Sequence, residues 1–140
     1  MAIVGFNFTK IEAERLESAK GKINVSNNVS ISKVEEKNLA LGNDKQKVLA
    51  FTFEFTSSYE PKVGQIKLTG ETLFMDDSKK AKEVLDGWKK EKKLPKEIMT
   101  GIINTILGKC NIQSLILSEQ VNLPAPIPLP RVQAAQQQSS

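Results

Sequence analysis

The sequence predicts an α+β protein: an antiparallel sheet of about four to five strands, followed by two helices and an extended proline-rich strap. Apolar and polar residues alternate through much of the first half of the chain, as in strands with one buried face. After residue 77 the apolar spacing becomes helical, and prolines then occupy every second position from 124 to 130. One-sided alternation favours an antiparallel sheet that packs on one side.

The length of the chain fits one domain with its own core. It has 140 residues and a formal net charge of +4. We expect a single domain over residues 1–132 and a disordered polar tail over 133–140. No run approaches the roughly 20 apolar residues of a membrane span, and no signal peptide is evident. The single cysteine excludes an intrachain disulfide and fits the cytoplasm, where we expect the protein to reside.

The first strand and a hairpin are predicted in the first 45 residues. Val4, Phe6 and Phe8 alternate with small or polar residues, which indicates a half-buried strand with an aromatic face. The more polar segment 11–16 loses this period, so we expect the strand to end irregularly there. Residues 23–31 read as a hairpin that turns at two adjacent asparagines, because Asn tolerates tight turns. A second turn is indicated at residues 42–44.

The clearest strand follows residue 50. Phe51, Phe53 and Phe55 alternate with Thr and Glu, so one face is aromatic and the other polar. We expect this aromatic face to form the core. The alternation breaks at residues 59–61 and resumes over 66–74, where an internal glycine indicates a bulge or a close backbone approach.

Two helices are expected next. Asp77 or Ser78 can cap the first, because either side chain accepts from the unpaired N–H groups of a first turn. Its apolar face holds Ala81, Val84, Leu85 and Trp88. Pro95 suits the first turn of a second helix that runs from Lys96 to about Gln120. Two internal glycines weaken that helix, so a break is predicted between residues 109 and 112.

The residue inventory argues against an enzyme, a metal site or a cofactor site. The chain has no histidine, which removes the commonest general base and zinc ligand. Cys110 lies on an apolar stripe and is expected to be a small buried hydrophobe. Asp76 and Asp77 are explained more simply as partners of a helix N-terminus than as metal ligands. No phosphate-binding glycine loop is present.

Two charged or unusual segments have alternative interpretations. Lys89–Lys93, beside Trp88, suits the solvated C-terminal end of a helix, and a nucleic-acid contact is the competing interpretation. In the strap, no two prolines are three residues apart, so it does not match a PxxP ligand. The strap either packs on its own sheet or contacts a partner or another subunit. Any apolar surface that one sheet and two helices leave uncovered would mark a binding groove or an interface.

The order of strands, helices and strap resembles the SecB export chaperone. Gly70–Phe74 is similar to a Gly and aromatic pattern on its last strand, Asn122–Pro126 to the stretch after its long helix, and Phe6–Ile11 to its first strand. The chain also resembles, over nearly its whole length, an archaeal family described only as SecB-like. That second similarity lies at Gly5–Phe8, Tyr59–Pro61, Lys109–Asn111 and Leu123–Val132.

This resemblance implies a four-stranded antiparallel sheet, assembly into dimers or tetramers, and apolar grooves that hold unfolded chains without ATP. SecB is acidic and this chain is basic, so the resemblance implies holding of clients rather than delivery to the SecB motor ATPase. The predicted contact residues are Phe6, Phe8, Phe74, Trp88, Leu123, Ile127 and Leu129. The alternatives are an assembly or adaptor protein that uses the same surface for a folded partner or for itself and, more distantly, a nucleic-acid-associated basic protein.

Overall fold

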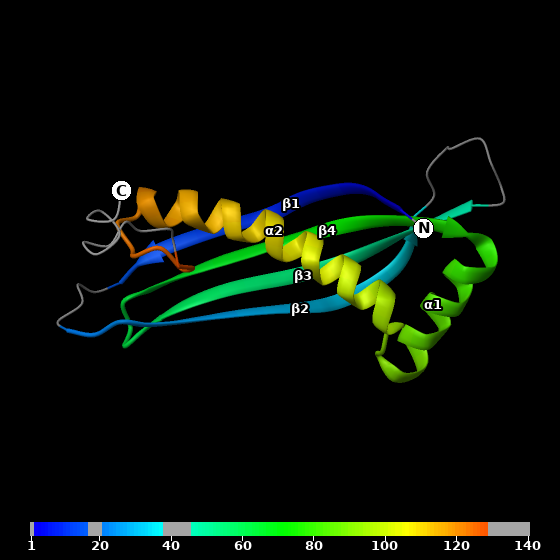
Figure 1. Cartoon of the computed structure of the whole chain (residues 1–140), viewed down its shortest axis with the longest axis horizontal. Helices are drawn as coiled ribbons and strands as arrows, with labels where there is room; N and C mark the ends of the chain where they lie inside the picture. The colour runs from blue at the N-terminus through cyan, green and yellow to red at the C-terminus, as the bar shows by residue number, and fades with distance from the viewer. Residues whose placement is uncertain (1, 17–20, 38–45, 129–140) are drawn as a thin grey trace, which may run out of the picture.

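The computed structural model describes residues 2–16, 21–37 and 46–128. Four strands are followed by two helices. Their bounds are β1 (Ala2–Arg15), β2 (Asn24–Lys37), β3 (Gln46–Glu60), β4 (Gly64–Asp77), α1 (Ser78–Glu91) and α2 (Lys96–Gln120). The predicted α+β class is therefore confirmed (Figure 1). The predicted turn at 42–44, the tail at 133–140 and Leu129 lie outside the described residues.

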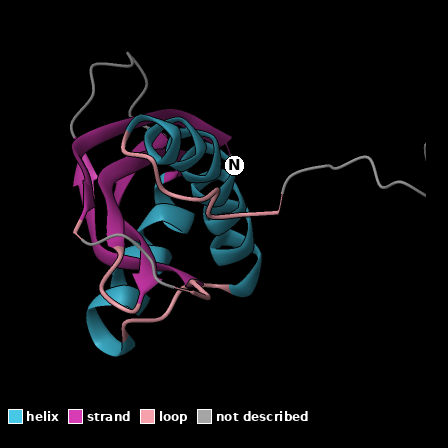
Figure 2. Cartoon of the chain, turned by 90° about the vertical axis from the view of Figure 1, so that its left-hand side faces the viewer, coloured by secondary structure: helices cyan, strands magenta, loops and turns pink. Residues whose placement is uncertain are grey.

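All strand pairs are antiparallel, in the order β1-β4-β3-β2. The sheet curves partly around the helices, which lie on the same face of it (Figure 2). β3 and β4 form the centre of the sheet, and β1 and β2 form its edges. This arrangement leaves one face of the sheet packed under the helices, while the other face is polar along most of the central strands and apolar around Ala50 and Leu73.

The core is the helix-side face of the two central strands. Phe51, Phe53 and Phe55 of β3 have no solvent exposure, and neither do Ile66 and Leu68 of β4. The intervening residues of both strands are polar for most of their length and half-buried. The predicted aromatic core is therefore confirmed.

Two strands are longer and more regular than the sequence suggested. Residues 11–15 continue β1 and pair with β4, so the predicted irregular end is wrong. The predicted hairpin at 23–31 is also wrong, because β2 passes straight through Asn27 and Asn28. These asparagines pair with Ser57 and Thr56 of β3. Pairing along the whole of β3 outweighs the local preference of Asn for turns.

Gly70 allows the closest approach within the sheet. A Cβ atom at this position would overlap the carbonyl oxygen of Asn7 and would lie 2.9 Å from Cζ of Phe53. The register between β1 and β4 shifts between Phe8 and Lys10, next to the partner of Gly70. The close approach predicted from this glycine is therefore confirmed.

Both helices begin as predicted, and the second also ends where predicted, at Gln120. The Asp77 side chain accepts from the backbone N–H of Lys80 at 2.8 Å and caps α1. α2 runs unbroken to Gln120, so the predicted break at 109–112 is wrong. Its buried stripe, repeated every fourth residue, spans the whole helix, and this packing offsets the cost of the internal glycines. The stripe consists of Ile98, Ile102, Ile106, Cys110, Ser114 and Ser118.

α2 crosses the sheet obliquely. It starts on the β2 side and ends toward β1, and it contacts β4, β1 and β3 (Figure 1). Its 25 residues span about 37 Å. The 14 residues of β1 or β4 span about 46 Å. An oblique helix that is shorter than the strands leaves two opposite corners of the apolar face without a helix above them.

We expect opposite effects from adding one methyl group at two glycines. Gly70→Ala should lower the free energy of unfolding by about 1–3 kcal/mol, because the methyl group overpacks the sheet. Gly108→Ala should raise it by about 0.5–1 kcal/mol, because this helical position has open space around it. Urea unfolding of both variants and the wild type measures the difference. Equal stability of the two variants would contradict the described packing at Gly70.

Candidate functional site

An apolar row on the edge strand β1 lies at the first uncovered corner. Ile3, Phe6, Phe8 and Ile11 pair with buried residues of β4, so their side chains lie on the helix-side face. We call these four residues the β1 row. Phe6 and Phe8 are half-buried, whereas Ile3 is 39% and Ile11 46% exposed. Apolar side chains therefore reach solvent along most of one edge of the sheet.

The aromatic members of the β1 row rest on the core. Phe6 stacks on Phe53 with ring centroids 5.2 Å apart. Phe8 meets Phe6 edge-to-face at 5.1 Å and Phe53 at 6.2 Å. Rings held this way are positioned by their neighbours before any ligand arrives. The cluster provides a preformed apolar floor that a second apolar side chain can cover.

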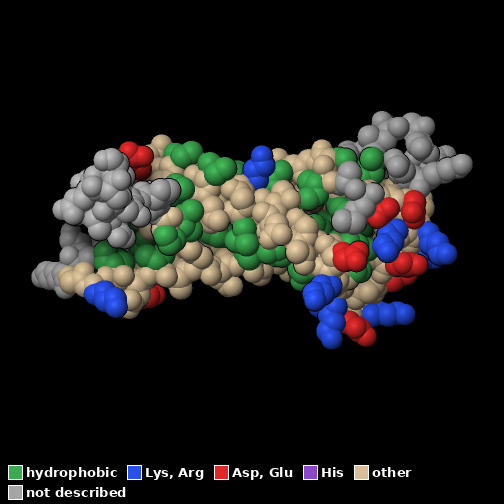
Figure 3. All heavy atoms as spheres, viewed as in Figure 1, with side chains coloured by type: hydrophobic (Ala, Val, Ile, Leu, Met, Phe, Trp, Pro, Cys, Tyr) green, Lys and Arg blue, Asp and Glu red, His purple; other side chains and the backbone are tan. Residues whose placement is uncertain are grey.

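The solvent face of α2 is also apolar. Ile112 is 63% exposed and Ile116 47% exposed, one turn apart. Between Thr100 and Ser118 the helix carries a single charged residue, Lys109. We call Ile112 and Ile116 the outer row. Charged side chains gather instead around α1, while apolar side chains lie along much of the remaining face (Figure 3).

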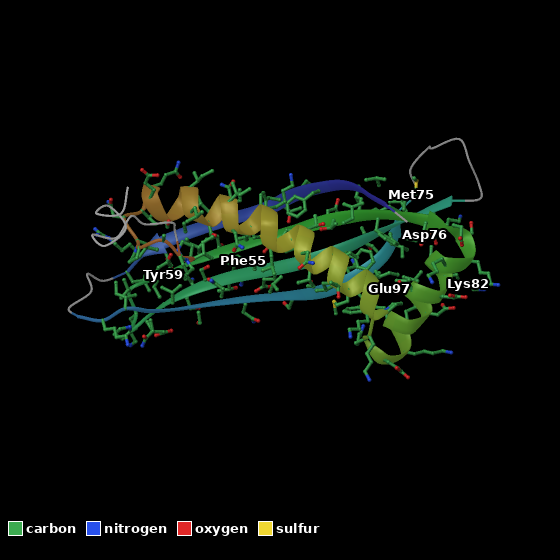
Figure 4. The ribbon with its side chains drawn as sticks, in the orientation of Figure 1. Phe55, Tyr59, Met75, Asp76, Lys82 and Glu97 are labelled. Carbon is green, nitrogen blue, oxygen red and sulfur yellow. The ribbon has the colours of Figure 1, made fainter. Side chains whose placement is uncertain are left out.

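The strap, residues 123–128, covers part of the second corner. The hydroxyl of Tyr59 donates to the carbonyl oxygen of Pro124 at 2.6 Å, and Nδ2 of Asn27 donates to that of Pro126 at 2.9 Å. Ser57 donates to Oδ1 of Asn27 at 2.6 Å and so fixes the orientation of the amide. Tyr59 lies at the end of β3, where α2 has crossed over to the β1 side (Figure 4). The strap therefore packs on its own sheet.

The predicted contact residues are distributed between the surface and the core. Phe6 and Phe8 belong to the β1 row, and Ile127 in the strap is half-buried. Three others have 8% exposure or less and pack in the core: Phe74, Trp88 and Leu123. Leu129 lies outside the described residues. A ligand can reach the three core residues only if the core opens, so the set as a whole stays a prediction.

The exposed isoleucines were not among the contact residues predicted from the sequence. Ile11 was missed because the bulge beside Thr9 shifts the alternation by one residue and returns Ile11 to the face of Phe8. Ile112 was missed because the expected break removed it from a regular helix. In an unbroken helix Ile112 lies on the opposite side of the helix axis from the buried stripe. That position would have identified it as an exposed residue.

The lysine run lies at the end of α1. Lys89 and Lys90 occupy its last turn, and Lys92 adopts a left-handed conformation at its C-cap. Nζ of Lys92 lies 5.4 Å from the Trp88 ring centroid. The acidic residue Asp86 borders the same surface hollow as Lys89. These contacts agree with a solvated helix end.

No cluster of metal-binding side chains and no activated cysteine occurs in the part of the chain that the structure describes. No group of three or more Cys, Asp or Glu residues there has the arrangement of a metal site. Burial raises the pKa of Cys110 to about 12, so its thiol stays protonated at neutral pH. None of the described helices is long and apolar enough to span a membrane. The surface features that could bind a partner include the β1 row, the outer row and the strap.

Comparison with known proteins identifies a structural neighbour. The structure is similar to that of the Mycobacterium tuberculosis SecB-like chaperone Rv1957, solved in complex with a ChAD peptide from the Rv1956 HigA1 antitoxin. The TM-score is 0.53, the identity is 12%, and the match covers 94% of this chain and 90% of that chain. At this identity the similarity shows a SecB-like fold. No protein-family model matches the sequence. No curated protein sequence matches it either.

We expect stability to fall as the pH rises above about 9. Burial raises the pKa of Tyr59 from 10.0 to about 12 and that of Cys110 from 9.0 to about 12. The unfolded chain therefore loses these protons at a lower pH than the folded chain, which favours unfolding at alkaline pH. Urea unfolding across this range measures the slope. Tyr59→Phe should flatten it between pH 10 and about 12, and an unchanged slope would contradict burial of the phenol.

Proposed function

We propose that this protein is a cytoplasmic chaperone that holds non-native polypeptides on apolar surface, without ATP, cofactor or catalysis. One observation carries the proposal: an edge strand exposes a continuous apolar row on the face that a soluble protein normally covers. Exposed apolar surface of this kind marks an interaction site. The row includes Phe6 and Phe8, which were predicted as contact residues.

The geometry of β1 suits an extended, unfolded partner. β1 has no neighbouring strand on its outer side within the described chain, so main-chain groups there are free to pair with an added strand. An extended chain that pairs at this edge would place alternate side chains over Ile3, Phe6, Phe8 and Ile11. Main-chain pairing needs no particular sequence, and this suits a protein that binds many unfolded chains.

The structural neighbour supports this class of function. Rv1957 is a SecB-like chaperone, and its structure holds a peptide. The absence of a metal cluster among the described residues, the lack of histidine and the protonated Cys110 thiol also favour binding over catalysis. The basic charge of this chain favours client holding that is independent of the SecB motor ATPase.

The proposal predicts that the protein suppresses aggregation of two unrelated denatured proteins at stoichiometric ratios, independently of salt. Ile3→Ser combined with Ile11→Ser should raise the amount needed by about tenfold, because the variant removes apolar contact area from the row. Light scattering by the aggregating protein is the measurement. Leu16→Ser removes an exposed apolar side chain that belongs to neither row, so it is the control and should act like the wild type. Failure of the wild type to protect either protein would overturn the proposal.

A second candidate function is self-assembly, and the outer row favours it. An α-helix with apolar side chains on its solvent face and one charge across its middle has the composition of a covered helix. We propose that α2 packs against α2 of a second copy in a dimer or a larger oligomer.

Self-assembly predicts a solution mass of at least twice the 15.5 kDa chain mass. Ile112→Glu combined with Ile116→Glu should reduce that mass to one chain, because charges would then be buried at the interface. Light scattering coupled to size-exclusion chromatography measures both. A monomeric wild type would rule out this assembly. An oligomeric charge variant would place the interface elsewhere.

A further inference from the structure

We infer that the strap is a tethered internal ligand, occupying a second polypeptide site from which an extended apolar segment of a client displaces it. The inference deepens the proposed function and rests on it. The site is the corner that α2 leaves at the start of β2 and the end of β3. We call it the strap seat, formed by Val25, Asn27, Ser57, Tyr59 and Gly64.

The seat recognises main chain rather than side chains. Tyr59 and Asn27 donate to the carbonyl oxygens of Pro124 and Pro126, which are groups that every polypeptide carries. Ser57 holds the Asn27 amide in the donating orientation. Donors arranged in this way can bind any extended chain whose carbonyl oxygens match their spacing. A sequence-tolerant site is what a binder of many clients requires.

Apolar side chains of the strap cover part of the seat. Leu123 is 6% exposed and rests on Gly64, where a Cβ atom would lie 3.1 Å from Cδ2 of the leucine. Pro126 is buried, whereas Val25 on the floor is half-buried. The half-buried Val29 and Ile31 extend the apolar floor along β2 beyond the strap. A longer client segment therefore has apolar surface to cover that the strap leaves open.

The strap is attached in a way that permits exchange. It forms no strand with β2 or β3, and its prolines have no N–H group to add to a ladder. The backbone N–H of Leu123 donates to the carbonyl of Ser118 at 2.8 Å, and Asn122 turns the chain after α2 with a positive φ of 57°. The strap is thus joined to α2 by a short turn and is held on the sheet by side chains.

Exchange with a client is favoured over simple opening. Without the strap, the hydroxyl of Tyr59 would exchange its carbonyl partner for water, and the apolar surface under Leu123 would be exposed to water. A client segment that supplies a carbonyl and apolar side chains restores the hydrogen bond and covers the apolar surface again. The strap therefore protects the site when no client is bound and competes with clients when they are present.

Hydrogen–deuterium exchange of the full chain tests the displacement directly. We expect saturating reduced, carboxymethylated α-lactalbumin, which stays unfolded, to speed exchange at the Leu123 N–H and the amides that follow it. Leu123→Ala weakens the strap but leaves the donors of the seat intact, so it should bind this unfolded protein at least about tenfold more tightly than the wild type. Leu117→Ala is the matched control, because Leu117 packs on the core from α2. It should show no gain in affinity.

The outcomes separate the two proposals. If the wild type binds the unfolded protein without faster exchange in the strap, or if Leu123→Ala binds no more tightly than Leu117→Ala, the strap inference is wrong and the proposed function stands. If neither the wild type nor Leu123→Ala binds, both are wrong. Faster exchange together with a gain specific to Leu123→Ala supports displacement.

Discussion

The aromatic face of the central strands is the constraint on which the rest of the structure depends. Phe51, Phe53 and Phe55 of β3, with their neighbours on β4, place a wide apolar surface on one side of a long sheet. Water must be excluded from that surface, and neither strand can do this for itself. α1 covers one end, α2 crosses the middle, and the strap covers part of what remains.

Because α2 crosses the sheet obliquely, it leaves two corners of the apolar face uncovered, and the two corners differ. At one corner the β1 row stays open, with Phe6 stacked on the core and Ile11 half exposed to water. At the opposite corner the strap covers Tyr59 and is held by its hydroxyl. If helices as long as the strands covered the whole apolar face, neither corner would be left uncovered. The surfaces proposed to bind polypeptide are therefore consequences of incomplete coverage.

The sequence predicted the elements whose pattern depends on near neighbours. The alternation around Phe53 and the cap at Asp77 required only local spacing and were confirmed. Asn27 was assigned to a turn because its true role, a bond to Pro126, joins residues 99 positions apart. The solvent exposure of individual apolar side chains was equally difficult to predict from the sequence. Trp88 and Ile112 are both large apolar residues, and only the path of the helices decides which of them is buried.

The short turn at Asn122 has a consequence for which chains the strap seat can select. A ligand joined to its site by so few residues has an effective concentration of about millimolar or more, although no free ligand is present. A short peptide that contacts the seat alone must overcome that concentration by itself. A long unfolded chain that also lies on the β1 row gains avidity from its second contact. Under the proposed displacement, the tether would therefore discriminate by length, in favour of long unfolded chains over short fragments.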